Sequence, residues 1–134
     1  MMQTWTEKLN CSKNPQKKKL TKSVAGMPAG ALMYISTPLE IDAYIRTIPR
    51  GQGVSIQHMR DDLAKMNKAD CTCPLTTGIF LRIVAEAAFE KLNSGDSSYL
   101  TPFWRVIDPK ANIIKKLSFD AAFIQQMRHD EGIA

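Results

Sequence analysis

The segment from Pro74 to Leu92 restricts the fold of this chain more than any other, because it reads as a helix that is apolar over most of its circumference. The exceptions recur at every fourth residue and form one narrow stripe: Gly78, Arg82, Glu86 and Glu90. A helix of this kind is stable only when other elements pack around it on several sides. The sequence therefore predicts a helical domain with residues 74–92 as its central helix.

Capping residues and apolar spacing predict three shorter helices beside the central one. The first follows Thr37-Pro38, a typical N-cap followed by a proline in the first turn, and ends before residues 49–53. The second opens at the N-cap residue Ser55 and stops at residues 67–70. The last begins near residues 118–120 and ends at Gly132, a residue typical of a helix C-terminus.

The remaining regular structure is predicted to be β. Residues 31–35 read as a short strand, and residues 104–117 read as a β-hairpin in which two apolar runs flank the turn residues 108–112. The fold class is therefore mainly α with a small β-hairpin. Helices joined by a tight connection and followed by a hairpin predict a winged helix-turn-helix, a fold that most often binds nucleic acid.

Charge is concentrated at the N-terminal end. Residues 1–24 contain six lysines and one acid, whereas the rest of the chain carries 12 basic and 12 acidic residues. We expect residues 1–30 to form a flexible basic arm and connector, and residues 31–134 to form the folded domain. Such an arm either contacts a polyanion through its lysines or serves only as a solvated leader.

Several classes of protein are not expected from this sequence. There is no run of about 18 apolar residues that could span a membrane, and the Lys-rich N-terminal segment lacks the apolar core of a secretory signal. Three cysteines are too few for a disulfide scaffold, so a reduced, cytoplasmic protein is predicted. His58 and His129 do not have metal-ligand spacing with the cysteines, and we expect neither a metal nor a cofactor.

Three short motifs in order resemble one family. Residues 48–55 read IPRGQGVS, residues 101–107 read TPFWRVI, and residues 129–132 read HDEG. They resemble the motifs I-P-x-G-x-x-x-S/T, I-P-C-H-R-V-V and L-L-x-H-E-G of the alkylguanine-DNA alkyltransferase DNA-binding domain, over about residues 39–132. The resemblance implies a winged helix-turn-helix of the alkyltransferase C-terminal-domain type, without the family's additional N-terminal domain.

The departures from the family pattern decide what activity the resemblance implies. Phe103 stands where the family has its acceptor cysteine, and Trp104 stands where it has the activating histidine. A phenyl ring has no nucleophilic atom, so alkyl transfer to this position is excluded. The chain is then most similar to the alkyltransferase-like proteins, which bind alkylated guanine without repairing it. Phe103, Trp104 and the retained carboxylate Glu131 either line a binding pocket or fill the core where a site would be.

The resemblance also implies a DNA-contacting surface, with double-stranded DNA, including DNA that carries alkylated guanine, as the partner. Its predicted contacts come from the start of the central helix, from the TPFWRVI motif and from the predicted wing: Thr76, Thr77, Gly78, Arg82, Arg105, Lys110, Lys115 and Lys116. Arg105 has an alternative interpretation as a buried ion pair with Glu131. The family's base-flipping arginine has no direct counterpart, because Arg82 lies a full turn later on the helix.

Two other hypotheses remain open at this stage. The domain could be a degenerate winged helix that has a protein partner and acts as an interaction or regulatory module. It could also be an enzyme that uses Cys71 or Cys73 as an alkyl acceptor, although neither lies on the motif that carries the family's active site. A measurement of DNA binding and its salt dependence separates a protein-interaction module from a DNA-binding domain.

Overall fold

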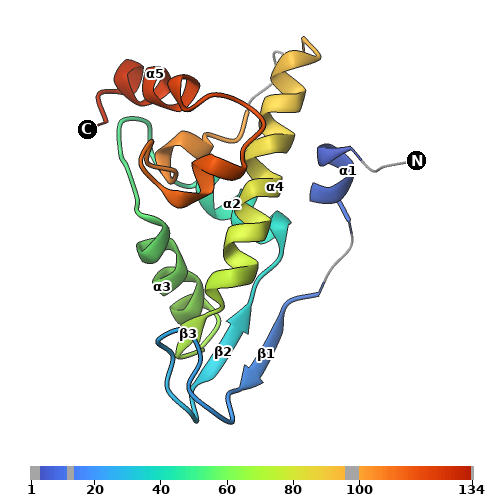
Figure 1. The fold of residues 1–134 in the computed structure, drawn as a ribbon, viewed down its shortest axis with the longest axis vertical. Coiled ribbons are helices and arrows are strands. Elements are labelled where there is room, and N and C mark those ends of the chain that lie inside the picture. The colour runs from blue at the N-terminus through green and yellow to red at the C-terminus, as the bar shows by residue number, and fades with distance from the viewer. Residues whose placement is uncertain (1–3, 12–13, 96–99, 134) are drawn as a thin grey trace.

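The computed structural model describes residues 4–11, 14–95 and 100–133, which form a mainly helical structure with a small three-stranded sheet (Figure 1). The elements in chain order are α1 (Trp5–Leu9), β1 (Gln16–Lys19), β2 (Leu32–Ile35), α2 (Pro38–Arg46), α3 (Ile56–Met66), β3 (Cys71–Thr72), α4 (Pro74–Asn93), the 3-10 helices η1 (Phe103–Arg105) and η2 (Asn112–Lys116), and α5 (Ala121–Glu131). None of the helices in these ranges has the length and apolar composition that a membrane crossing requires.

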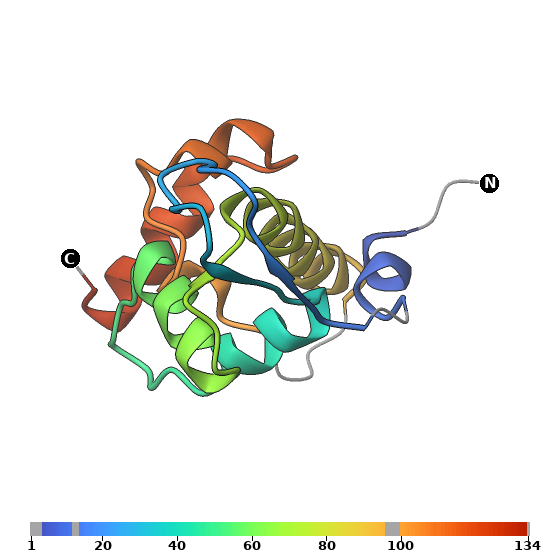
Figure 2. The ribbon, with the colours of Figure 1, turned by 90° about the horizontal axis from the view of Figure 1, so that it is seen from below.

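Helix α4 is the centre of the molecule, as the sequence predicts. It packs against α1, α2, η1 and η2, and Leu81, Val84 and Ala85 are completely buried. Viewed from below, α4 lies between α2 and α3 on one side and the segment that contains η2 on the other (Figure 2). These neighbours cover most of its apolar surface, whereas Leu75, Ile79 and Leu92 remain exposed.

The predicted helix termini are confirmed by their capping hydrogen bonds. The Thr37 hydroxyl accepts from the Glu40 amide (3.1 Å) at the start of α2, and the Ser55 hydroxyl accepts from the His58 amide (3.0 Å) at the start of α3. At the end of α5, Gly132 has a φ of +75°, a left-handed conformation that glycine adopts without a steric cost.

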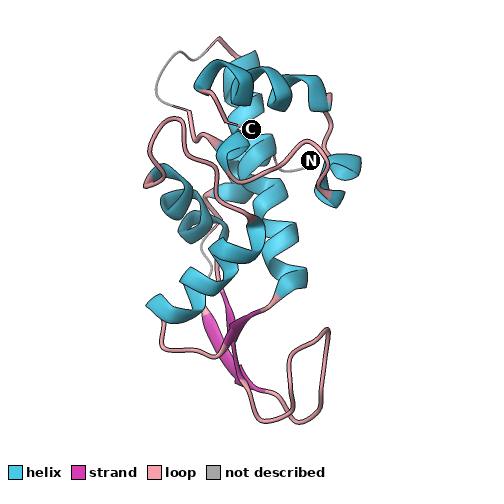
Figure 3. Cartoon of the chain, turned by 90° about the vertical axis from the view of Figure 1, so that its left-hand side faces the viewer, coloured by secondary structure: helices cyan, strands magenta, loops and turns pink. Residues whose placement is uncertain are grey.

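The sheet has the order β1-β2-β3 and lies at one end of the molecule (Figures 1 and 3). β1 pairs antiparallel with β2, and β2 pairs parallel with β3, so that Lys18 lies opposite Met33 and Met33 lies opposite Cys71. The parallel connection between β2 and β3 contains α2 and α3. Because α4 begins directly after β3, the sheet is held next to the N-terminal end of the central helix.

The basic N-terminal segment differs from the flexible arm expected from its sequence. Residues 16–19 form a paired strand, and α1 packs against α4. The Glu90 carboxylate of α4 accepts hydrogen bonds from the amides of Trp5 (3.2 Å) and Thr6 (3.1 Å) and from the Thr6 hydroxyl (2.8 Å). Residues 1–3, 12 and 13 of the predicted arm lie outside the described residues.

The β-hairpin predicted for residues 104–117 is wrong. This segment contains the 3-10 helices η1 and η2 in place of two strands. The Val106 amide donates to the Phe103 carbonyl (3.0 Å), and the Ile114 amide donates to the Ala111 carbonyl (3.1 Å). These backbone groups therefore form hydrogen bonds within local turns and not with a partner strand. All of residues 101–107 are buried, so the first apolar run packs into the core as a turn and does not form one face of a strand pair.

Candidate functional site

A groove of about 300 Å³ lies between the first half of α4 and η2, and it brings together three of the predicted DNA-contacting residues. Those three are Gly78, Arg82 and Lys116. The remaining residues that line the groove are Pro74, Leu75, Ile79, Asn112 and Ile113. The groove therefore combines an apolar floor with two cationic side chains.

The α4 side of the groove presents unusually exposed apolar side chains. Leu75 is 70% exposed and Ile79 is 50% exposed, and they lie one turn apart on the helix. Gly78 lies between them, and a Cβ atom added at Gly78 would meet nothing within 4 Å. The backbone at Gly78 is consequently open to close approach by a ligand.

Arg82 lies one turn after Gly78 on α4, and two neighbouring side chains hold it in place. Its Nε lies 3.9 Å from an oxygen of the buried Glu86 carboxylate, and its guanidinium lies 5.1 Å from the centroid of the Trp5 ring. The ring thus orients the guanidinium by a cation–π contact. The contact between Trp5 and Arg82 could not be predicted from the sequence, because it depends on α1 docking against α4.

The hydroxyl groups of the two threonines predicted to contact DNA are both buried. Thr77 is completely buried, and its hydroxyl donates to the Cys73 carbonyl (2.7 Å). The Thr76 hydroxyl is buried without a hydrogen-bond partner among the described residues. Neither hydroxyl is available to a phosphate at the surface, so the expected contacts from Thr76 and Thr77 are corrected.

The lysines predicted to form a basic wing do not share one surface. Lys115 and Lys116 are exposed on η2, and Lys116 lines the groove. Lys110 lines a separate hollow of about 410 Å³ with residues of α5. Lys110 and Lys116 line different hollows because residues 104–117 fold as successive turns and do not form one hairpin.

Arg105 is buried in a network around Glu131 and is not a surface contact. Its Nε donates to Glu131 Oε1 (2.8 Å), and a terminal nitrogen donates to Oε2 (3.1 Å). Trp104 Nε1 donates to Oε2 (2.7 Å), and the Gly51 amide donates to Oε1 (3.0 Å). This carboxylate has four donors and a side chain that is only 2% exposed. It joins α5 to η1 and to the loop after α2, so of the two interpretations the buried ion pair agrees with the structure.

The surroundings of Glu131 determine its charge. Burial by itself raises the pKa of the carboxyl group, but hydrogen bonds from Arg105, Gly51 and Trp104, together with the charge of Arg105, outweigh burial and hold the pKa at about 2. Glu131 is therefore ionised throughout the neutral and mildly acidic range. An ionised, fully engaged carboxylate acts here as a structural acceptor, not as a proton donor.

Phe103 fills the core at the position where the resembled family has its acceptor cysteine. The side chain is 1% exposed, and its ring lies 5.6 Å from that of Phe119 and 6.0 Å from that of Phe123. Trp104 is also buried, in edge contact with Phe103 at 5.3 Å. Phe103 and Trp104 are thus parts of an aromatic cluster, and the interpretation as a core filling agrees with the structure.

The cysteines considered as alternative acceptors lie at the sheet end of α4. Cys71 is in β3, and Cys73 is the residue that precedes α4. Burial, followed by the charge of Asp70, raises the pKa of Cys71, which disfavours the reactive thiolate. Within the described ranges no cluster of three His, Cys, Asp or Glu side chains could hold a metal ion.

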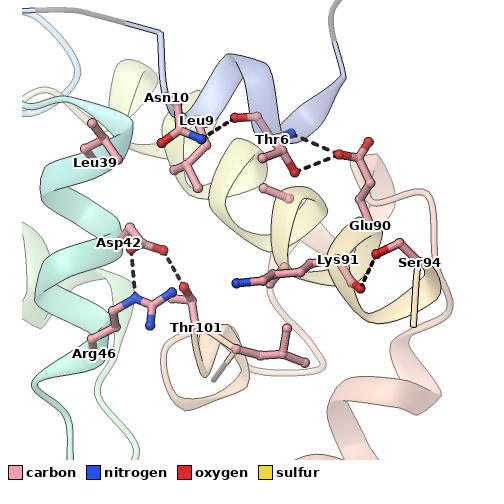
Figure 4. A pocket seen from close by; sticks show the side chains of 13 residues that line it. Thr6, Leu9, Asn10, Leu39, Asp42, Arg46, Glu90, Lys91, Ser94 and Thr101 are labelled. Carbon is pink, nitrogen blue, oxygen red and sulfur yellow. Dashed lines mark hydrogen bonds and ion pairs between the residues drawn. The ribbon is translucent and has the colours of Figure 1, made fainter. Parts of the chain in front are cut away.

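A second hollow, of about 440 Å³, lies between α1, α2 and α4 (Figure 4). In it the Asp42 carboxylate accepts a hydrogen bond from the Thr101 hydroxyl and pairs with Arg46 Nε at 2.9 Å. Sequence reasoning could not find this hollow, because one of its walls is α1, which was not predicted. Both acidic residues of the hollow are engaged, Asp42 by Arg46 and Thr101, and Glu90 by the start of α1.

The groove at α4 and η2 is the candidate functional site. No family model, curated protein or solved structure matches this chain. The function is accordingly argued from the groove's chemistry: an open helix backbone, two exposed apolar side chains and two cations. Such a surface binds a partner that offers both negative charge and apolar area.

Proposed function

We propose that this protein binds double-stranded DNA without chemical modification, through the groove between α4 and η2. The observation that carries the proposal is the convergence of Gly78, Arg82 and Lys116, three predicted DNA contacts from two separate segments, on that groove. In this proposal α3 and α4 are the two helices of a helix-turn-helix unit, as the resemblance to alkyltransferase-like proteins implies.

The chemistry of the groove suits a nucleic-acid backbone. Arg82 and Lys116 supply the cations that phosphates require, and such contacts fix a protein's position on a duplex. Gly78 lets the chain come close to a phosphate. Leu75 and Ile79 can pack against sugars or a displaced base, as apolar wedges do in minor-groove binding.

Alkyl transfer is not part of the proposed function, because Phe103 leaves no thiol at the acceptor position. We expect that incubation with DNA carrying isotope-labelled methylguanine leaves no label on the protein. Intact-mass measurement after the incubation tests this. A stoichiometric increase in mass would contradict it, and peptide mapping would then identify the modified cysteine among Cys11, Cys71 and Cys73.

A charge placed at Gly78 tests the site without disturbing the fold. The position is open, and replacing a helical glycine by a residue with a side chain stabilises a helix by up to about 1 kcal/mol. We expect Gly78→Glu to stay folded and to bind duplex DNA at least tenfold more weakly, about 1.4 kcal/mol, because the carboxylate repels phosphate. Fluorescence anisotropy with a labelled duplex measures the affinity.

Gly78→Gln is the matched control, since it adds the same volume without the charge. A Gln variant that binds like the wild type assigns the loss to charge. A Gln variant that loses as much as the Glu variant indicates close backbone contact at Gly78, which also places DNA in the groove. Wild-type affinity in a folded Gly78→Glu protein would refute the proposed site.

A protein partner is the second candidate function, and the exposure of Leu75 and Ile79 favours it. An amphipathic segment with acidic residues would fit an apolar strip flanked by Arg82 and Lys116. DNA binding with a steep salt dependence distinguishes the two candidates, because a protein contact made mainly by apolar side chains depends little on salt.

A further inference from the structure

The β1–β2 hairpin carries a charge pattern that the groove does not explain. Residues 16–35, which form the hairpin, contain four lysines and no acidic residue. Three of the lysines, Lys17, Lys18 and Lys19, follow one another in β1, and all four residues of that strand are exposed. The strand lies at the edge of the sheet, paired with β2 on one side only.

The lysine side chains of the hairpin remain available to a ligand. Lys17, Lys18, Lys19 and Lys22 form no ion pair with any residue in the described part of the chain. Two carboxylates beside the sheet, one in the residue before β3 and one in α2, accept hydrogen bonds from other groups. Asp70 accepts from the Leu32 amide (2.8 Å), and Glu40 accepts from the Tyr34 hydroxyl (2.8 Å).

The hairpin holds its lysines in a defined arrangement. Beyond β1 the chain is fixed by hydrogen bonds from the Leu20 amide to the Ala31 carbonyl (2.9 Å) and from the Gly30 amide to the Leu20 carbonyl (2.7 Å). Side chains alternate along a strand, so Lys17 and Lys19 share one face, about 7 Å apart, while Lys18 faces the other way. The cations therefore surround the free edge of the sheet.

The hairpin lies next to the proposed DNA site. Lys18, Met33 and Cys71 are aligned across the three strands, and neighbouring strands are about 4.8 Å apart, which puts the Lys18 backbone about 10 Å from Cys71. Cys71 is followed three residues later by Pro74, the first residue of α4. In addition, the Cys73 amide donates to the Tyr34 carbonyl of β2 (2.9 Å).

From these observations we infer that the β1–β2 hairpin is a second phosphate-contacting surface, and that it takes the place of the wing predicted for residues 104–117. This inference rests on the proposed function. Lysine ammonium groups bind phosphates as point charges, and duplex DNA carries one charge per about 1.7 Å of its axis, enough to meet several lysines. An added peptide strand is a poorer occupant, because lysines along an edge oppose strand addition.

The test compares two triple variants of the full chain. Lys17→Gln/Lys18→Gln/Lys19→Gln removes the charges, and Lys17→Arg/Lys18→Arg/Lys19→Arg keeps them. Each phosphate contact contributes about 0.9 to the slope of log affinity against log salt. We expect the Gln variant to lose between about 2 and 3 from that slope and to bind more than tenfold more weakly at 0.1 M salt, while the Arg variant keeps both. Circular dichroism verifies that both variants are folded.

The outcomes separate this inference from the proposed function. If the wild type binds DNA and the Gln variant keeps its slope, the hairpin is only a protected sheet edge and the inference is overturned. If the triple Lys→Gln variant shows a weaker salt dependence of binding while Gly78→Glu binds normally, the hairpin inference stands and the groove is refuted as the DNA site. If the wild type does not bind DNA, or polyglutamate competes as well as DNA does, the proposed function and the inference are both overturned.

Discussion

Replacing Glu131 with Gln is expected to lower the free energy of unfolding by between about 3 and 5 kcal/mol, because it breaks a buried ion pair and leaves Arg105 without its counter-charge. The neutral amide also offers an N–H₂ group where four donors now converge, from Arg105, Trp104 and the Gly51 amide. Urea denaturation measures the change. The exposed neighbour Asp130 is the control, since Asp130→Asn should change stability by less than about 0.5 kcal/mol.

The same substitution should alter the pH dependence of stability. The pKa of Glu131 is about 2 in the folded protein, against an ordinary value of 4.5. A lowered pKa stabilises the folded state above the unfolded pKa, and this stabilisation is lost as the pH falls from about 5 towards 2. Its size is about 3 kcal/mol. Glu131→Gln should remove this part of the acid sensitivity, and an unchanged pH profile would show that the carboxylate is not buried and paired.

Truncation of Phe103 should have a comparable effect for a different reason. Phe103→Ala is expected to cost between about 3 and 5 kcal/mol, because the ring is buried among Phe119, Phe123 and Trp104 and its removal leaves a cavity. Thermal and urea unfolding measure the loss.

Phe103→Leu provides the comparison, since it keeps most of the volume and should cost clearly less than Phe103→Ala. The two variants decide whether this position is core or pocket. A residue that lines an open pocket tolerates truncation, so a cost below about 1 kcal/mol for Phe103→Ala would contradict the core assignment.

The parts of the fold that were predictable are those that local chemistry specifies. Thr37, Ser55 and Gly132 mark helix ends through their own side chains or backbone, and the apolar surface of residues 74–92 identifies a central helix whatever surrounds it. These signals act within a few residues, so they can be interpreted without knowledge of the tertiary structure.

The parts that could not be predicted depend on distant partners. The QKKK segment of β1 has little intrinsic preference for a strand and forms one because β2 offers an edge. Helix α1 forms against Glu90, which is 84 residues from Thr6. The same limit affected the candidate site: Gly78, Arg82 and Lys116 were found from the sequence, but the burial of Thr77 and Arg105 and the contribution of Trp5 follow from packing alone.

The attachment of α1 to Glu90 also has a consequence for the order in which the protein folds. The Glu90 carboxylate that holds α1 in place is in the second half of α4, so during synthesis α1 cannot dock until at least about two thirds of the chain has been made. A five-residue helix is not stable by itself in water. Helix α1 is therefore not formed until Glu90 is in place, and its docking is a late, non-local step of folding.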